Sequence, residues 1–453
     1  MRSSPPRFAV ASRRVVTPEG TRAAAVIISG GRIEAIVNRD HVPSEVPVED
    51  FDGLVISPGL VDAHVHINEP GRTDWEGFAT ATRAAAAGGV TTLVDMPLNS
   101  SPVTTTVAAL EEKRAAAAGQ CWVDVGFHAG LVPDNLADIE PLLDAGVCGV
   151  KAFMCDSGLA EFPATGVDEF LQAMPILARR QVPLLVHAEL PEPQARQNPS
   201  PQRTNSEFAN SRIGWETNAV STLISLIRRF RCPTHVVHVS CVMAARAIRE
   251  AKYETLPVTA ETCPHYLTFA SEEIPEHDAR FKCAPPIYNR ENRGDLWQHL
   301  IAGSLELVAS DHSPCPIDMK LPPHVQFADA WGGISSLQLT LSAVWTGAAK
   351  RNVPIDKLAE WLSRNPARLV GLADRKGRIA VGCDADLCVW NHEEEWTVVG
   401  EQLQHRHKLT PYEGERLRGR VKRTYVRGQL AYADGRFPAG PIGELLRRPP
   451  RTS

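Results

Sequence analysis

The chain has 453 residues, of which 43% are hydrophobic and 22% charged, and its formal net charge is −5 at pH 7. This composition is typical of a globular protein with one large core and a smaller second unit, and the acidic balance excludes a globally basic surface for nucleic acid. No stretch approaches the roughly 18 apolar residues that span a bilayer, and the N-terminus lacks a signal-peptide pattern. The ten cysteines form no C-x-x-C pair, which favours free thiols in a reducing compartment. We therefore expect a cytoplasmic protein without a membrane or nucleic-acid partner.

Short apolar runs alternate with helix-like segments from about residue 54 to about residue 350. The eight runs are Leu54–Ile67, Gly89–Met96, Trp122–Leu131, Gly149–Met154, Pro183–His187, Thr234–Val239, Leu256–Leu267 and Leu305–Ser310. Segments with helical spacing or alanine-rich content lie between them, among them Trp75–Ala87, Val107–Ala118, Glu207–Arg229 and Arg290–Ile301. The alternation predicts a parallel sheet of the α/β class with right-handed crossovers. Eight repeats favour a closed (β/α)₈ TIM barrel over an open sheet.

The two ends of the chain have a different character. Residues 8–53 and about 373–440 are rich in β-type residues and turns, so both ends are candidates for one small sheet unit, although the pattern alone leaves their pairing open. We divide the chain into an N-terminal β part (1–57), a barrel (58–372), a C-terminal β part (373–440) and a flexible tail (441–453).

Several of the apolar runs end in side chains that can bind metal ions. His64 and His66 close the first run, and side chains at i and i+2 lie on the same face of a strand. Such an H-x-H pair is a weak indication alone, but four more candidates end other runs: Lys151, His187, His238 and Asp311. Barrel enzymes place their chemistry at the C-terminal strand ends, so the accumulation favours a shared site. We expect the neighbouring His235 and His312 to be hydrogen-bonded structural residues.

The side chains of these six residues fit metal chemistry. Neutral imidazole and carboxylate groups suit zinc and its first-row neighbours. Lysine is a poor ligand as an ammonium ion, but a desolvated lysine has a lowered pKa and becomes nucleophilic enough to capture CO₂.

Longer motifs around these residues resemble the amidohydrolase superfamily and its cyclic-amidohydrolase branch over nearly the whole chain. They are Pro58–His66, Gly149–Met154, Glu261–Leu267 and Gly382–Leu387. The last resembles the closing segment of the small β-sandwich that both termini build in this family, so the resemblance implies that the two ends pair.

Within that branch, five further fragments are most similar to the allantoinases: His66–Thr73, Asp95–Ser100, Lys282–Ile287, Ser310–Pro316 and His407–Tyr412. Dihydroorotases resemble the first fragment but have an arginine at the position of Asn68, where it grips the substrate carboxylate. A neutral amide cannot form that ion pair, whereas it suits allantoin, which has a hydantoin ring, a ureido arm and no carboxylate. Hydantoinases and dihydropyrimidinases place a tyrosine five residues after the lysine, where this chain has Asp156.

Two positions depart from the allantoinase pattern. Related enzymes often have His or Asn at the position of Asp156, and an arginine at the position of Tyr288. Each departure leaves two readings open, a shifted substrate preference or a surface-loop change without consequence.

The resemblance implies a binuclear hydrolase that opens the ring of allantoin to give allantoate. One divalent ion would be bound by His64, His66 and Asp311. A second would be bound by His187 and His238, and carbamylated Lys151 would bind both ions. Zinc is expected, with manganese, iron and cobalt as alternatives. Asp311 would take a proton from the attacking water and return it to the leaving ring nitrogen. The expected substrate contacts are Asn68, Asp156, His265, Ser313 and Gly332. We expect Asp62 to support its strand end. The resemblance also implies a homotetramer.

Two alternatives stay open at this point. The first is another ring-opening amidohydrolase, such as a hydantoinase or dihydropyrimidinase, with a different ring substrate. The second is a scaffold relative that keeps the barrel but lacks the metal ligands, which the six intact ligand positions argue against.

Overall fold

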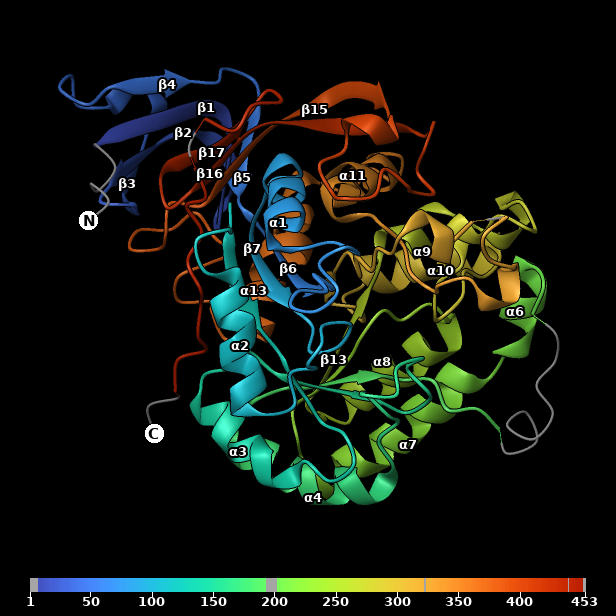
Figure 1. Ribbon diagram of the computed structural model, residues 1–453. Coiled ribbons are helices and arrows are strands. Elements are labelled where there is room, and N and C mark those ends of the chain that lie inside the picture. The colour runs from blue at the N-terminus through green and yellow to red at the C-terminus, as the bar shows by residue number, and fades with distance from the viewer. Residues whose placement is uncertain (1–6, 193–201, 322, 439, 451–453) are drawn as a thin grey trace.

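The computed structural model describes residues 7–192, 202–321, 323–438 and 440–450. Strands from the two ends of the chain lie together on one side of the molecule, and the alternating strands and helices of the middle of the chain fill the other side (Figure 1). The fold is a (β/α)₈ barrel with a small β-sandwich domain built by both termini, which confirms the predicted class. Among the described residues, each helix is too short or too polar to cross a membrane.

The barrel strands are short and almost wholly buried, as expected for a parallel sheet covered on both faces. In chain order they are β6 (Leu60–Val65), β7 (Val90–Asp95), β8 (Asp124–Phe127) with β9 (Ala129–Gly130), β10 (Val150–Phe153), β11 (Leu184–His187), β12 (Thr234–Val236), β13 (Val258–Thr262) and β14 (Leu307–Val308). Neighbours in this order pair in parallel, and a bridge between Val65 and His312 closes the ring. The strand ends therefore face one common mouth.

The helices pack around this barrel and place the βα loops. Their bounds are α1 (Phe78–Ala87), α2 (Val107–Ala117), α3 (Leu136–Asp144), α4 (Val167–Arg180), α6 (Asn205–Ser211), α7 (Trp215–Phe230), α8 (Val242–Tyr253), α9 (Pro264–Thr268), α10 (Arg290–Ile301), α11 (Thr340–Ala349), α12 (Ile355–Ala359) and α13 (Asn365–Leu369). Local sequence explains several starts: the side chain of Thr106 accepts a hydrogen bond from Ala109 N at the start of α2, and Asn289 does the same for Asn292 N in α10.

The terminal domain has its own sheet, in the order β17-β16-β15-β5-β1-β2-β3, with β4 beside β1. Its strands are β1 (Phe8–Thr17), β2 (Gly20–Ser29), β3 (Arg32–Val37), β4 (Val48–Asp50), β5 (Val55–Pro58), β15 (Leu387–Thr397), β16 (Arg416–Val426) and β17 (Gln429–Ala433). The antiparallel pair of β5 and β15 joins the two ends of the chain, and a hydrophobic core separate from that of the barrel lies against the sheet.

Three predicted elements differ from the observed ones. The first apolar run is two strands, because Gly59 separates β5 of the terminal sheet from β6 of the barrel. The seventh run ends in helix α9, which begins at Pro264, a residue suited to the first turn of a helix. The predicted helix Glu207–Arg229 is two helices, and the break contains Gly214 at a φ of 84°.

The predicted flexible tail, residues 441–453, is docked on the barrel over its described part, 441–450. Ile442 and Leu446 are buried, and Leu445 forms a parallel bridge with Val125 of β8. Backbone hydrogen bonds also join Gly443 to Cys121. The segment is polar and proline-rich, and its few apolar residues carry the contact. Residues 451–453 lie outside the described part of the chain.

Candidate active site

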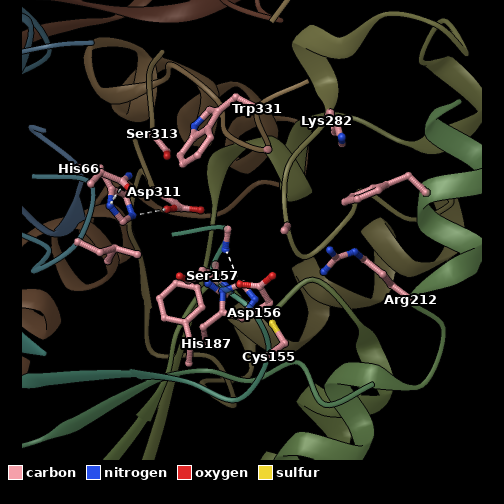
Figure 2. A pocket seen from close by; sticks show the side chains of 18 of the residues that line it. His66, Cys155, Asp156, Ser157, His187, Arg212, Lys282, Asp311, Ser313 and Trp331 are labelled. Atoms are coloured by element: carbon pink, nitrogen blue, oxygen red, sulfur yellow. Dashed lines mark hydrogen bonds and ion pairs between the residues drawn. The ribbon is translucent and has the colours of Figure 1, made fainter. Parts of the chain in front are cut away.

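A cavity of about 500 Å³ opens at the C-terminal ends of the barrel strands. The six predicted metal ligands all line it, although they come from five different strand ends: His64, His66, Lys151, His187, His238 and Asp311. Figure 2 shows His66 and Asp311 on one side of the cavity, His187 at its floor, and Arg212 and Lys282 on the opposite side. The barrel topology thus brings together residues that are up to 247 positions apart in the sequence, because Asp311 lies beside His64.

His64, His66 and Asp311 form a tight group. Asp311 Oδ1 lies 3.1 Å from His64 Nε2 and 3.5 Å from His66 Nε2. The two imidazoles come from the end of β6 and are 5.4 Å apart between ring centroids. Asp311 has a positive φ of 46°, an uncommon conformation for a non-glycine residue that occurs often at functional sites.

Lys151, His187 and His238 form the rest of the cluster. His238 lies between the other histidines, with its ring centroid 5.4 Å from that of His64 and 4.5 Å from that of His187. Lys151 is completely buried on β10, and within the described part of the chain its Nζ has no hydrogen-bond acceptor; it lies 4.9 Å from the centroid of the Phe153 ring.

Burial sets the protonation of these groups. It lowers the pKa of His66 to about 4 and that of Lys151 to about 8, and it lowers the pKa of His187 and His238 as well. Burial alone would raise the pKa of Asp311, but the adjacent His64 and His66 lower it to about 2. At neutral pH His66, His187 and His238 are therefore neutral imidazoles, and Asp311 is an ionised carboxylate.

Carboxylates behind the cavity orient two of the histidines. Glu261 Oε1 lies 2.6 Å from His64 Nδ1, and its other oxygen lies 3.0 Å from His235 Nε2. Glu189 Oε2 lies 2.8 Å from His187 Nε2. An ionised carboxylate only accepts hydrogen bonds, so each of these ring nitrogens carries a proton and the other nitrogen of His64 and His187 keeps its lone pair free.

Some of the predicted substrate contacts line the cavity and others are buried outside its lining. Asp156, Ser313 and Gly332 line the cavity. Asn68, two residues after the cavity residue His66, is fully buried and is not among the lining residues; it has a φ of 67°, and its Nδ2 donates to the carbonyl oxygen of Pro314 over 3.3 Å. His265 is also fully buried, and both of its ring nitrogens lack a hydrogen-bond partner.

The other residues singled out in the sequence lie outside the cavity lining. Asp62 accepts from the backbone N–H groups of His64 and Ser310, so it ties the first strand end to the last. His312 Nε2 lies 3.4 Å from Glu76 Oε2, and His235 binds Glu261, which agrees with the structural roles expected for both histidines. Tyr288 is half-buried and does not line the cavity.

Sequence reasoning missed several residues of this site. Glu189 stands two positions after His187, so strand periodicity contained an indication of it, and Glu261 opens a motif that was noted only for its resemblance. Asn99, whose Nδ2 lies 3.2 Å from His66 Nδ1, and the cavity residue Lys282 lie in loops, within fragments noted only for their resemblance, and the cavity residue Arg212 lies in a helix break inside a segment with helical spacing.

The cluster fits a metal centre. His64 Nε2, His238 Nδ1 and Lys151 Nζ are buried without a hydrogen-bond partner, and such groups are costly unless something else satisfies them. Nitrogen and carboxylate donors of this kind suit divalent first-row metals. Within the described residues, His64, His66 and Asp311 have ligand atoms close enough together to hold one ion.

Comparisons with known proteins agree with this geometry. The model of the amidohydrolase family matches residues 55–214 and 216–431. An allantoinase of Streptomyces avermitilis is 47% identical, over 97% of this chain and 98% of that protein, and an allantoinase of Arabidopsis thaliana is 42% identical, over 96% and 90%. Among solved structures, the L-hydantoinase (dihydropyrimidinase) of Arthrobacter aurescens superimposes with a TM-score of 0.90 at 28% identity, over 97% of this chain and all of that one.

Proposed function

Since this chain belongs to the amidohydrolase family and its full-length relatives include allantoinases, we propose that it hydrolyses the ring amide of allantoin to give allantoate. It is a hydrolase that acts on cyclic amides. The observation that carries the proposal is the convergence of six polar side chains from five strand ends on one buried cavity. The neutral Asn68, two residues after the cavity residue His66, supports a substrate without a carboxylate.

The six cavity residues would hold two divalent ions, with His64, His66 and Asp311 at one ion and His187 and His238 at the other. Zinc suits the donor set, and manganese, iron and cobalt are compatible with it. When bound, such a pair supplies Lewis acidity, which acidifies a water molecule and polarises the ring carbonyl.

Lys151 would link the two ions as a carbamate. Its lowered pKa of about 8 gives a sizeable fraction of free amine near neutral pH. The amine nitrogen attacks CO₂, a new N–C bond forms, and one amine proton is released. The product is a carbamate anion with two oxygens. It would replace the buried ammonium group of Lys151, which has no hydrogen-bond partner among the described residues, by a negative group that suits a cationic centre.

Asp311 would move the proton during ring opening. Its low pKa keeps it ionised, so it accepts a proton from the attacking water as the new C–O bond forms. The same carboxyl group then protonates the ring nitrogen as the C–N bond breaks, because an unprotonated amide nitrogen is a poor leaving group. Glu261 and Glu189 keep His64 and His187 in fixed orientations throughout.

The remaining assignments belong to the same proposal. Asn68, Asp156, His265, Ser313 and Gly332 would contact or orient the substrate. The ten cysteines are unpaired, which supports a cytoplasmic location, and a homotetramer is proposed from the family resemblance.

Steady-state kinetics of the zinc-reconstituted protein on allantoin, hydantoin, dihydrouracil and dihydroorotate test the proposal. We expect the highest kcat/KM on allantoin. A higher value on dihydrouracil or hydantoin would replace the substrate assignment by a dihydropyrimidinase or hydantoinase activity and leave the hydrolytic chemistry standing. Absence of turnover on all four rings would contradict the proposal.

A further inference from the structure

Arg212 lies in the break between α6 and α7 and lines the active-site cavity. The break exists because Gly214 starts α7 in a left-handed conformation, so the chain turns at residues 212–214 and does not continue as one helix. Figure 2 shows the guanidinium of Arg212 pointing into the cavity from the wall opposite His66 and Asp311, toward the side where Asp156 lies.

The guanidinium is held in a fixed position by its neighbours. Its Nη1 donates to Glu189 Oε2 over 2.6 Å. Its Cζ lies 4.6 Å from the ring centroid of Phe208 and 4.8 Å from that of Trp215, and both rings also line the cavity. The cation is therefore oriented before any substrate arrives, which lowers the entropy cost of using it in binding.

This guanidinium keeps N–H donors that no other group among the described residues satisfies. Arginine has five N–H donors, and the bond to Glu189 uses one of them. The side chain is 17% exposed, and the exposed part faces the cavity. Arg212 thus offers N–H groups to a ligand, while its charge is already partly balanced by Glu189.

The position of Arg212 relative to the reacting groups limits which part of a substrate it can meet. Nη1 of Arg212 and Nε2 of His187 bind the same oxygen of Glu189, so the guanidinium is one carboxylate oxygen away from the His187 ring. The ring amide must lie at the cluster of histidines and Asp311. In allantoin, the ureido arm is attached to the ring carbon beside the carbonyl that is hydrolysed. The arm therefore extends from the cluster toward the wall of the cavity that carries Arg212.

We propose that Arg212 binds the carbonyl oxygen of the substrate's ureido arm and makes the enzyme prefer a ureido-substituted ring to a bare hydantoin ring; this rests on the function proposed above. A urea group has one strong acceptor and several N–H donors. Arg212 supplies donors only, and the exposed carboxylate of Asp156 supplies acceptors on the side toward which the guanidinium points. The two side chains therefore match the two kinds of group on the arm.

The test compares one substrate with the arm and one without it. For the zinc-reconstituted wild type and Arg212→Met, kcat/KM is measured on allantoin. For hydantoin, kcat/KM is measured if the ring is hydrolysed, and the inhibition constant is measured if hydantoin only competes with allantoin. We expect Arg212→Met to lose about 10- to 100-fold in kcat/KM on allantoin, the value of a hydrogen bond to a charged group, mostly through KM. The hydantoin constant should change by less than about threefold.

Two further variants separate binding from structure. Arg212→Lys keeps a cation beside Glu189 but has no planar fork, so it should remain impaired on allantoin with normal hydantoin constants. Arg229→Met removes an exposed arginine of helix α7, which follows the break that contains Arg212, and should leave the constants for both substrates unaffected. Zinc content is measured for every variant and should equal that of the wild type.

The outcomes are distinct. An equal loss on both rings in Arg212→Met, restored in Arg212→Lys, would show that Arg212 acts only through Glu189 and His187 and would overturn the inference. An unchanged kcat/KM on allantoin would overturn it as well. Failure of the wild type to hydrolyse allantoin would instead refute the proposed function, before any variant is compared.

Discussion

Two buried clusters of ionisable side chains in this molecule contain a lysine and several metal-binding residue types, but they differ in how their hydrogen bonds are satisfied. In the first, at the cavity, Lys151 Nζ and several imidazole nitrogens have no hydrogen-bond partner among the residues that the structure describes. In the second, at the other end of the barrel, Lys376 Nζ lies 2.6 Å from both Asp124 and Asp386 and 3.0 Å from Asp384. Arg427 also binds Asp124.

The difference shows which cluster is structural. Burial would lower the pKa of Lys376, but the three carboxylates raise it, so the ammonium form is stabilised; at Lys151 the pKa is lowered to about 8 because burial has little to oppose it. The Lys376 cluster joins β8 of the barrel to the C-terminal segment beyond α13, and its three carboxylates already share the lysine cation, so they need no metal ion. The Lys151 cluster is incomplete without one. Residue types alone do not distinguish a metal centre from a salt-bridge network. The two are distinguished by whether the buried polar groups have hydrogen-bond or ion-pair partners within the protein.

Replacing the unpaired lysine should have the largest effect on activity. In Lys151→Met, we expect hydrolysis of allantoin to fall to background, because the ligand that we propose to link the two ions is lost. The metal-free protein should be as stable as the wild type or more so, since the buried ammonium group has no partner to lose. Assays after zinc and bicarbonate treatment and thermal melts of the metal-free forms check both halves. Retained activity, or a large loss of metal-free stability, would contradict the comparison.

Replacing the paired lysine should have the opposite effect. Lys376→Met leaves Asp124, Asp384 and Asp386 buried without their shared cation, and we expect the free energy of unfolding to fall by about 3–5 kcal/mol. The kcat/KM of the folded fraction should stay within about twofold of the wild type, because the cluster lies at the opposite end of the barrel. Denaturant melts and assays on the same samples measure the two quantities. A stable but inactive variant would reverse the assignment of the two clusters.

A smaller effect is expected behind the cavity. Glu261→Gln removes the negative charge 2.6 Å from His64 Nδ1 and should weaken zinc binding by about 10- to 100-fold. Competition with a chelator measures the affinity. Glu306→Gln is the matched control, because Glu306 is a half-buried carboxylate near the start of β14, away from the cavity. Equal affinities of the two variants would rule out a role for Glu261 in orienting His64.

The sequence predicted the parts of the site that follow strand periodicity. His64, His66, Lys151, His187 and His238 stand at the ends of apolar runs, so their common location followed from the barrel topology. Arg212 escaped prediction because it lies in a helix break that depends on one glycine, within a segment with continuous helical spacing.

Contacts between distant segments were also beyond prediction from the sequence. The pairing of Glu261 with both His64 and His235, and the docking of Ile442 and Leu446 on the barrel, join residues far apart in the chain, and no local pattern encodes such contacts. The terminal sheet was assigned from a family resemblance because composition alone left the pairing of β5 and β15 open.

The number of zinc ions bound per chain, measured by elemental analysis after reconstitution with zinc and bicarbonate, decides whether the Lys151 cluster is a binuclear metal centre. We expect two ions per chain in the wild type and fewer in Lys151→Met, with a carbamate resonance from ¹³C-labelled bicarbonate in the wild type alone. Binding of substantially less than one ion per chain by the folded wild-type protein would contradict this assignment.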